Sequence, residues 1–227
     1  MRCLWCDQEI VLDLSWTTLL FLRKTSNICK ICAEKLEQIT GRQCIRCGRM
    51  EDKTICDDCR RWKCYYHHND VLTMNRSIFV YNQMIKEMIN RWKYRGDYIV
   101  GKLFQSYVEH FYSEYKRLLP KQTIVVPIPL SEQRMKERGF NQAKMLADFF
   151  PLPQADILGR MHREKQSKKT KQQRLQSKNP FHQVSKLNKT VLLVDDIYTT
   201  GTTLRHAAEI LKQNGCPKIY AWTLIRG

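Results

Sequence analysis

The chain has 227 residues, of which 43% are hydrophobic and 27% are charged, values typical of a globular protein with one medium-sized domain and a small second one. No apolar run reaches the roughly 18 residues that a membrane-spanning helix needs, so membrane insertion is not expected. The apolar stretch 10–22 is interrupted by Asp13 and no small-residue cleavage site follows it, which argues against a signal peptide. We therefore expect a cytoplasmic protein.

The formal net charge of +17 is unevenly distributed along the chain. Residues 1–70 carry 12 Lys and Arg against 10 Asp and Glu, whereas residues 71–227 carry 27 against 12. A basic excess of this size favours polyanions such as nucleic acid, or highly phosphorylated substrates. Charge that serves only solubility is the alternative interpretation.

Eight of the ten cysteines form four Cys-x-x-Cys pairs within the first 59 residues. Two such pairs supply the four thiolates of a tetrahedral structural Zn²⁺ site, and their clustering favours metal over a disulfide framework or a redox pair. A gap of 22 residues separates the first two pairs and a gap of 8 separates the last two, and both neighbouring and interleaved pairings are open. The predicted zinc ligands are Cys3, Cys6, Cys29, Cys32, Cys44, Cys47, Cys56 and Cys59.

A zinc-binding module is therefore expected at 1–70, followed by a second domain at 71–227. The second domain opens with a predicted strand at 77–81 and an amphipathic helix at 84–92 that Gly96 ends. Asp97 is expected to begin a longer helix with a buried apolar side.

Two basic residues, Lys93 and Arg95, lie at the end of the first of these helices. They either reach a bound phosphate or only complement the charge of the helix end. A buried strand is predicted at 123–129, where prolines stop it, and a basic loop at 134–142 and a helix at 143–149 follow.

Residues 160–178 contain a single acid and eight basic residues, which include Lys168, Lys169 and Lys171. The segment is polar and has no apolar period, so we interpret it as a flexible excursion from the α/β pattern. Its charge could neutralise several phosphates of a DNA strand. A solvated run of charge is the alternative.

The stretch 191–203 is the most informative part of the chain. Four apolar residues lead into Asp195 and Asp196, and a cluster of hydroxyls around Gly201 precedes an apolar helical period. A buried strand, a tight loop and a helix N-terminus in this order form an anion site, and the two acids suit the hydroxyls of a sugar. The alternative is a strand capped by Asp and Thr without a ligand.

A last strand is predicted at 219–225, so strands and helices alternate after residue 76. This alternation predicts an α/β fold with a Rossmann-like parallel sheet.

The 191–203 stretch resembles the 5-phosphoribosyl-1-pyrophosphate (PRPP) motif of type I phosphoribosyltransferases. The resemblance implies that Asp195 and Asp196 are the catalytic pair and bind the ribose hydroxyls, directly or through hydrated Mg²⁺. It further implies pyrophosphate binding by Arg134 and Arg138, and closure of 160–178 over PRPP. The residues implied to hold the 5-phosphate are Thr199, Thr200, Gly201, Thr202 and Thr203.

Three further motifs make the resemblance more specific. Lys-Tyr-Arg-Gly-Asp at 93–97, Val-Pro-Ile-Pro at 126–129 and Arg-Gly-Phe-Asn-Gln at 138–142 stand in this order behind the cysteine pairs. Together with the PRPP motif they resemble the ComF family of late-competence proteins, over essentially the whole chain.

That resemblance implies a PRPP-binding protein that acts in DNA uptake during natural transformation. Single-stranded DNA and a competence helicase or another uptake protein are the implied partners. Two other functions remain open. One is an active Mg²⁺-dependent phosphoribosyltransferase of nucleotide or purine salvage or synthesis, with an unidentified acceptor. The other is a zinc-stabilised adaptor for uptake proteins.

Overall fold

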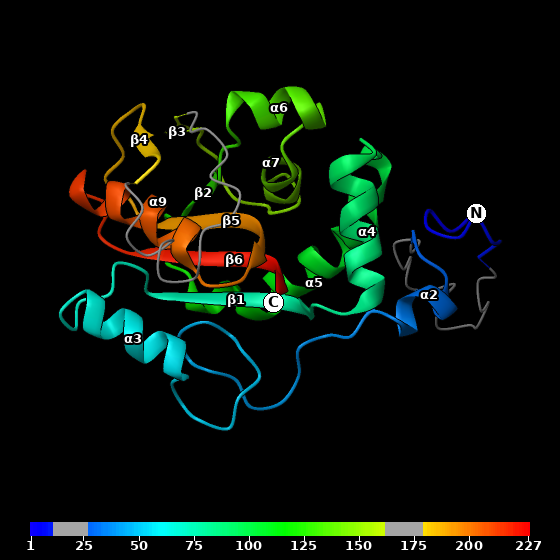
Figure 1. The fold of residues 1–227 in the computed structure, drawn as a ribbon, viewed down its shortest axis with the longest axis horizontal. Helices are drawn as coiled ribbons and strands as arrows, with labels where there is room; N and C mark the ends of the chain where they lie inside the picture. The colour runs from blue at the N-terminus through cyan, green and yellow to red at the C-terminus, as the bar shows by residue number, and fades with distance from the viewer. Residues whose placement is uncertain (11–26, 162–178) are drawn as a thin grey trace.

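The computed structural model describes residues 1–10, 27–161 and 179–227 (Figure 1). Its centre is a four-stranded sheet in the order β1–β6–β5–β2, in which all neighbouring strands are parallel. This confirms the predicted α/β fold with a parallel sheet. The strands are β1 (Met74–Val80), β2 (Ile124–Pro127), β5 (Val191–Tyr198) and β6 (Ile219–Arg226).

The sheet separates two apolar layers because successive strand residues point to opposite faces. Val125 and Leu192 belong to one layer, and their neighbours Val126 and Leu193 to the other. The first layer includes α4 (Gln83–Tyr94), the 3₁₀ segment η1 (Tyr98–Phe104) and α5 (Gln105–Tyr115), which the short η2 (Lys116–Leu118) follows. The second includes α9 (Thr202–Gln213).

The structure corrects the predicted continuation after α4. Gly96 has a φ of 66° and follows the helix as expected, but Asp97 does not cap a long helix. Its carboxylate instead accepts a 2.6 Å hydrogen bond from Nε of Arg91, and the chain passes through η1 before α5 begins.

The predicted basic loop at 134–142 is also wrong, because most of it is helical. Helix α6 (Glu132–Arg138) begins where the Ser131 hydroxyl accepts a hydrogen bond from the backbone N–H of Arg134, and Gly139, with a φ of 77°, follows its end. Helix α7 (Gln142–Ala147) comes next and packs on β2 and β5. Both caps are visible in the sequence as Ser131 and Gly139.

Strand β5 continues through both acids to Tyr198, beyond the expected end at Val194. Its partner explains the extra length, because β6 runs parallel to it and pairs Asp195 with Thr223 and Tyr198 with Arg226. Asp195 and Asp196 therefore lie within a paired strand and not in a loop.

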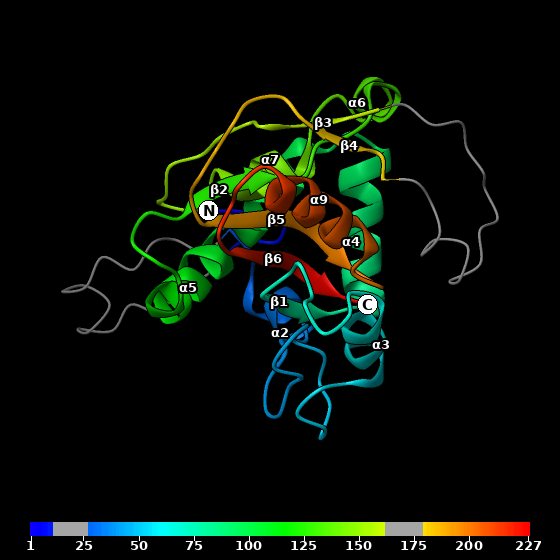
Figure 2. The same ribbon diagram turned by 90° about the vertical axis from the view of Figure 1, so that its left-hand side faces the viewer.

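Two short antiparallel strands, β3 (Leu158–Arg160) and β4 (Phe181–Gln183), flank the basic excursion. Figure 2 shows both strands and α6 above the sheet. Residues 162–178, with Lys168, Lys169 and Lys171, lie outside the described residues.

The cysteine-rich part contributes two short helices, α2 (Lys30–Glu34) and α3 (Asp57–Tyr65). Figure 1 shows α2 beyond α4 at one end of the molecule and α3 below β1 toward the other end. The predicted boundary at residue 70 falls in the connection between α3 and β1. Within the described parts of the chain, no helix has the length and apolar character needed to cross a membrane.

Candidate functional site

A polar cavity of about 150 Å³ lies at the carboxyl edge of β2 and β5. This edge is where parallel α/β sheets bind ligands. The structure brings four separate parts of the chain to it: the end of α4, the α6–α7 region, the end of β3 and the PRPP motif. Its charged lining residues are Lys93, Arg134, Arg138, Arg160, Asp195 and Asp196.

The two acids have different surroundings. The ammonium group of Lys93 forms an ion pair with Oδ2 of Asp196, and these side chains are only 11% and 13% exposed. The carboxylate of Asp195 accepts a 2.9 Å hydrogen bond from the backbone N–H of Asp196. Burial, with the neighbouring charge of Asp196, raises the pKa of Asp195 to about 7, although Lys93 and Arg160 oppose the shift. Asp195 therefore titrates near neutrality.

Three arginines and the amide of Gln142 also line the cavity. Nη1 of Arg138 donates a 3.0 Å hydrogen bond to Oε1 of Gln142, while the buried Nε2 of Gln142 has no hydrogen-bond partner among the described residues. Burial, followed by the charge of Arg134, lowers the pKa of Arg160. A free buried donor beside guanidinium groups that repel one another suits a bound anion.

The hydroxyl cluster forms the turn between β5 and α9. The hydroxyls of Thr200 and Thr202 lie 2.9 Å apart, and Thr203 lines the cavity, whereas Thr199 is exposed. Gly201 has a φ of 78°, and a Cβ there would collide with the hydroxyl of Tyr198. Position 201 therefore requires glycine for two reasons: the backbone has a positive φ, and there is no room for a Cβ atom.

The side chains of Trp62 and Arg205 support this turn, and the sequence did not predict a functional role for either residue. Arg205 is 1% exposed and binds both carboxylate oxygens of Asp70, at 3.1 and 2.8 Å, and the hydroxyl of Tyr198 at 2.8 Å. Its guanidinium lies 4.5 Å from the ring centroid of Trp62. The indole N–H of Trp62 in turn donates a 2.8 Å hydrogen bond to the carbonyl of Thr200.

Arg226, at the end of β6, is a third brace. Its Nη1 donates 3.1 Å hydrogen bonds to the carbonyls of Tyr198 and Thr199, and its Nη2 lies 3.8 Å from Sγ of Cys47. No local sequence pattern reveals this role, because its partners are 27, 28 and 179 positions away. Arg160 also lines the cavity, although the sequence indicates only that it belongs to the basic segment 160–178.

Arg95 is not brought to the cavity. It is exposed and lines a different depression, with Trp5, Glu87 and Arg91. The backbone explains the difference, because Lys93 is the penultimate residue of α4 and faces the sheet edge, whereas Arg95 follows the helix.

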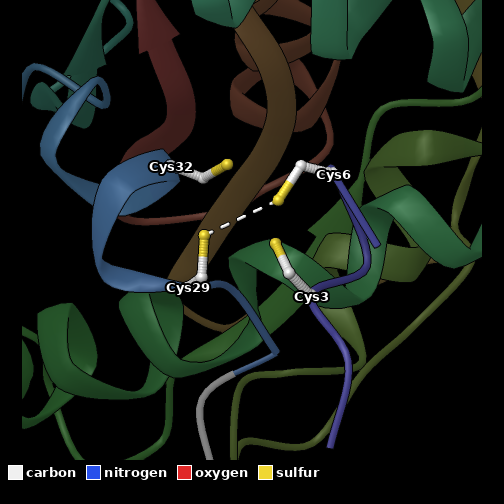
Figure 3. Close-up of side chains that lie close together, drawn as sticks. All are labelled: Cys3, Cys6, Cys29 and Cys32. Atoms are coloured by element: carbon white, nitrogen blue, oxygen red, sulfur yellow. Dashed lines mark hydrogen bonds between the residues drawn. The ribbon is translucent and has the colours of Figure 1, made fainter. Parts of the chain in front are cut away.

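Each half of the cysteine-rich part gathers four sulfurs. Cys3, Cys6, Cys29 and Cys32 form the first cluster (Figure 3), and Cys44, Cys47, Cys56 and Cys59 form the second.

The sulfurs within each cluster lie within 4.8 Å of one another, with 3.7 Å between Cys6 and Cys29 and 3.6 Å between Cys47 and Cys56. A tetrahedral Zn²⁺ with bonds of about 2.3 Å separates its sulfur ligands by about 3.8 Å, so both sets fit this ion. Neighbouring pairs therefore share a site, and the interleaved pairing is not found.

Comparison with known proteins agrees with this geometry. The family model "Phosphoribosyl transferase domain" matches residues 114–227. Competence protein ComFC of Bacillus subtilis (strain 168) is 39% identical over 99% of this chain and 94% of its own. Its namesake in Streptococcus pneumoniae is 34% identical over the full length of both chains. The chain belongs to the ComF family.

A more distant relative, Competence protein F of Haemophilus influenzae, is 25% identical over 64% of the chain and 69% of its own. The ComF resemblance inferred from the motifs is thereby confirmed. The protein is a competence-related ComF protein with a phosphoribosyltransferase-type domain, and its cavity lies within and beside the matched region.

Proposed function

We propose that this ComF protein binds PRPP together with Mg²⁺ in the cavity at the carboxyl edge of β5. The observation that carries the proposal is the joining of two adjacent carboxylates, four cationic side chains and the start of α9 around one polar cavity. The turn 199–203 would hold the 5-phosphate, Asp195 and Asp196 the ribose hydroxyls, and Arg134 and Arg138 the pyrophosphate.

A carboxylate pair and phosphate oxygens are the hard ligands that Mg²⁺ prefers. When bound, the ion would neutralise pyrophosphate and favour its departure. The protein's own acids would stabilise the positive charge that develops on the ribose ring, and Lys93 would remain paired with Asp196 until the ligand arrives. Phosphoribosyl transfer to an acceptor follows from this arrangement as the proposed activity.

The test is the double substitution Asp195→Asn with Asp196→Asn. We expect Mg²⁺-dependent PRPP binding to disappear in calorimetry, because neutral amides neither hold the ion nor accept both ribose hydroxyls strongly. Arg95→Gln is the matched control, since Arg95 carries a charge of the same region but lies away from the cavity. Unchanged PRPP affinity in the double variant would contradict the proposal.

We further propose that the protein acts in DNA uptake in the cytoplasm and binds single-stranded DNA there. The names of its relatives and the net +15 of residues 71–227 support this role. Two structural Zn²⁺ ions in the cysteine clusters would hold the N-terminal part in place.

Affinity for a labelled oligonucleotide should fall steeply with salt, since each phosphate that the protein neutralises releases counterions. Replacing Lys168, Lys169 and Lys171 with Gln should make that dependence shallower, by a slope of about 0.7 for each phosphate that the variant leaves unneutralised. Absence of binding at low salt would exclude the DNA role while leaving PRPP binding to its own test.

A further inference from the structure

Two exposed tyrosines, Tyr94 and Tyr98, are not part of the cavity lining but neighbour residues that are. Tyr94, the last residue of α4, is 74% exposed, and Tyr98, the first residue of η1, is 48% exposed. Large aromatic rings usually bury most of their surface, so two such rings within five positions are a notable exposed apolar area.

Both rings are held from the side of the cavity. The guanidinium of Arg138, which lines the cavity, lies 5.9 Å from the ring centroid of Tyr94. Tyr98 packs edge-to-face on Phe140, with 5.0 Å between centroids, and Phe140 lies against the buried Trp92. The tyrosines are therefore positioned by the same α4 and α6–α7 segments that carry Lys93, Arg134 and Arg138.

Cationic side chains lie near the rings, and Asp97, which directly precedes Tyr98, is paired with Arg91. Arg134 and Arg138 project from α6, and neither forms an ion pair with any acid among residues 1–10, 27–161 and 179–227. Exposed aromatic rings interspersed with such arginines form the pattern that binds bases and phosphates of nucleic acids: a base stacks on the ring, and the guanidinium groups take the phosphates.

We propose that Tyr94 and Tyr98 form a stacking surface for a nucleobase at the mouth of the PRPP cavity. This inference rests on the proposed function, because it gives the chemical class of the second ligand of that site. The base is either a free aromatic heterocycle, placed to receive the phosphoribosyl group, or a base of a single strand. The stacking chemistry is the same in both cases.

The experiment compares three ligands on the zinc-loaded full-length protein. These are a short single-stranded oligothymidylate, an abasic strand of the same length and charge, and free purine and pyrimidine bases offered with Mg²⁺ and PRPP. The variants are Tyr94→Leu with Tyr98→Leu, which keeps apolar bulk, and Tyr94→Phe with Tyr98→Phe, which keeps the rings.

We expect wild type and the Phe variant to bind a base-containing ligand about tenfold or more tightly than the Leu variant, as loss of stacking on one or two rings would give. Preference for thymidylate over the abasic strand identifies the strand as the source of the base. Binding of a free base only in the presence of PRPP identifies an acceptor.

Equal binding of thymidylate and abasic strands by wild type, together with no binding of free bases, would overturn the proposal. Equal affinity of the Leu and Phe variants for every ligand would overturn it as well. PRPP affinity is measured in parallel and should change by less than about twofold in the Leu variant. Failure of the wild type to bind PRPP would instead contradict the proposed function, so the two failures are distinguishable.

Discussion

The two cysteine clusters are built from the same Cys-x-x-Cys pairs but are connected to different parts of the molecule. In the first cluster Cys6 is exposed, and the adjacent Trp5 lies 5.5 Å from the guanidinium of Arg91 on α4. In the second cluster all four cysteines are buried, and Cys47 lies next to Arg226, which binds the carbonyls of the turn after β5.

This difference shows that one cysteine motif can support two different parts of the molecule, depending on what packs beside it. The first cluster supports the side of α4, whose last turn carries both Arg91 and Lys93. The second cluster, with α3 and its Trp62, supports the turn expected to hold the 5-phosphate. Loss of either metal should therefore affect the cavity in a different way.

The largest expected effect is removal of the second cluster. Cys44→Ser with Cys47→Ser and, as the matched variant, Cys3→Ser with Cys6→Ser should each lower the zinc content by one ion per chain. PRPP affinity should fall at least about tenfold (~1.4 kcal/mol) only in the former, because Thr199 and Thr200 are then no longer braced. Metal analysis and calorimetry on the same folded samples measure both quantities, and equal affinities would refute the assigned difference.

Should the second-cluster variant fail to fold, Trp62→Phe tests the same connection. Phenylalanine keeps an aromatic ring under Arg205 but lacks the N–H that binds the carbonyl of Thr200. We expect PRPP affinity to drop by about two- to tenfold with zinc content unchanged, as for the removal of one hydrogen bond.

An intermediate effect is expected for Gly201→Ala. Gly41 is the control, because its φ of 73° resembles the 78° of Gly201 but a Cβ there meets no atom within 4 Å. Gly41→Ala should destabilise by about 1 kcal/mol through the backbone alone, whereas Gly201→Ala should cost about 2 kcal/mol or more through collision with Tyr198 and Arg205. Urea unfolding measures both losses of stability. Equal losses would show that the side chains of Tyr198 and Arg205 can move aside at little cost.

The smallest expected effect is a change in the number of protons released when the ligand binds. It tests whether Lys93 at the end of α4 influences Asp195. Because the pKa of Asp195 is about 7 and the ligand favours the carboxylate, Mg²⁺–PRPP binding at pH 7 should release roughly half a proton. Lys93→Met removes a charge that lowers this pKa, so the release should approach one proton. Arg226→Met should leave the release unchanged.

Binding enthalpies in buffers of different ionisation enthalpy measure this release. Asp195→Asn is the control, since it removes the titrating group. A release that does not respond to Lys93→Met would show that Lys93 does not tune the acids.

Several parts of the site could be predicted because their signals are local. The apolar run before Asp195, the hydroxyls around Gly201 and the period of α9 follow one another directly within 191–213, so their pattern indicates a strand, turn and helix. The grouping of cysteines into pairs is local in the same sense. The sequence predicts a loop in place of α6, although Ser131 and Gly139 mark both ends of the helix, because its many charges obscure any apolar helical period.

The sequence by itself therefore determined the parallel α/β class, the strand, turn and helix of 191–213, the four Cys-x-x-Cys pairs and the family. Only the tertiary structure decided which groups meet across the chain: Lys93 with Asp196, Arg205 with Asp70, and Arg226 with both Cys47 and the turn. The physical reason is that helical and strand periods arise from neighbouring residues, whereas these ion pairs and braces join positions more than 25 apart whose separation depends on how the layers pack.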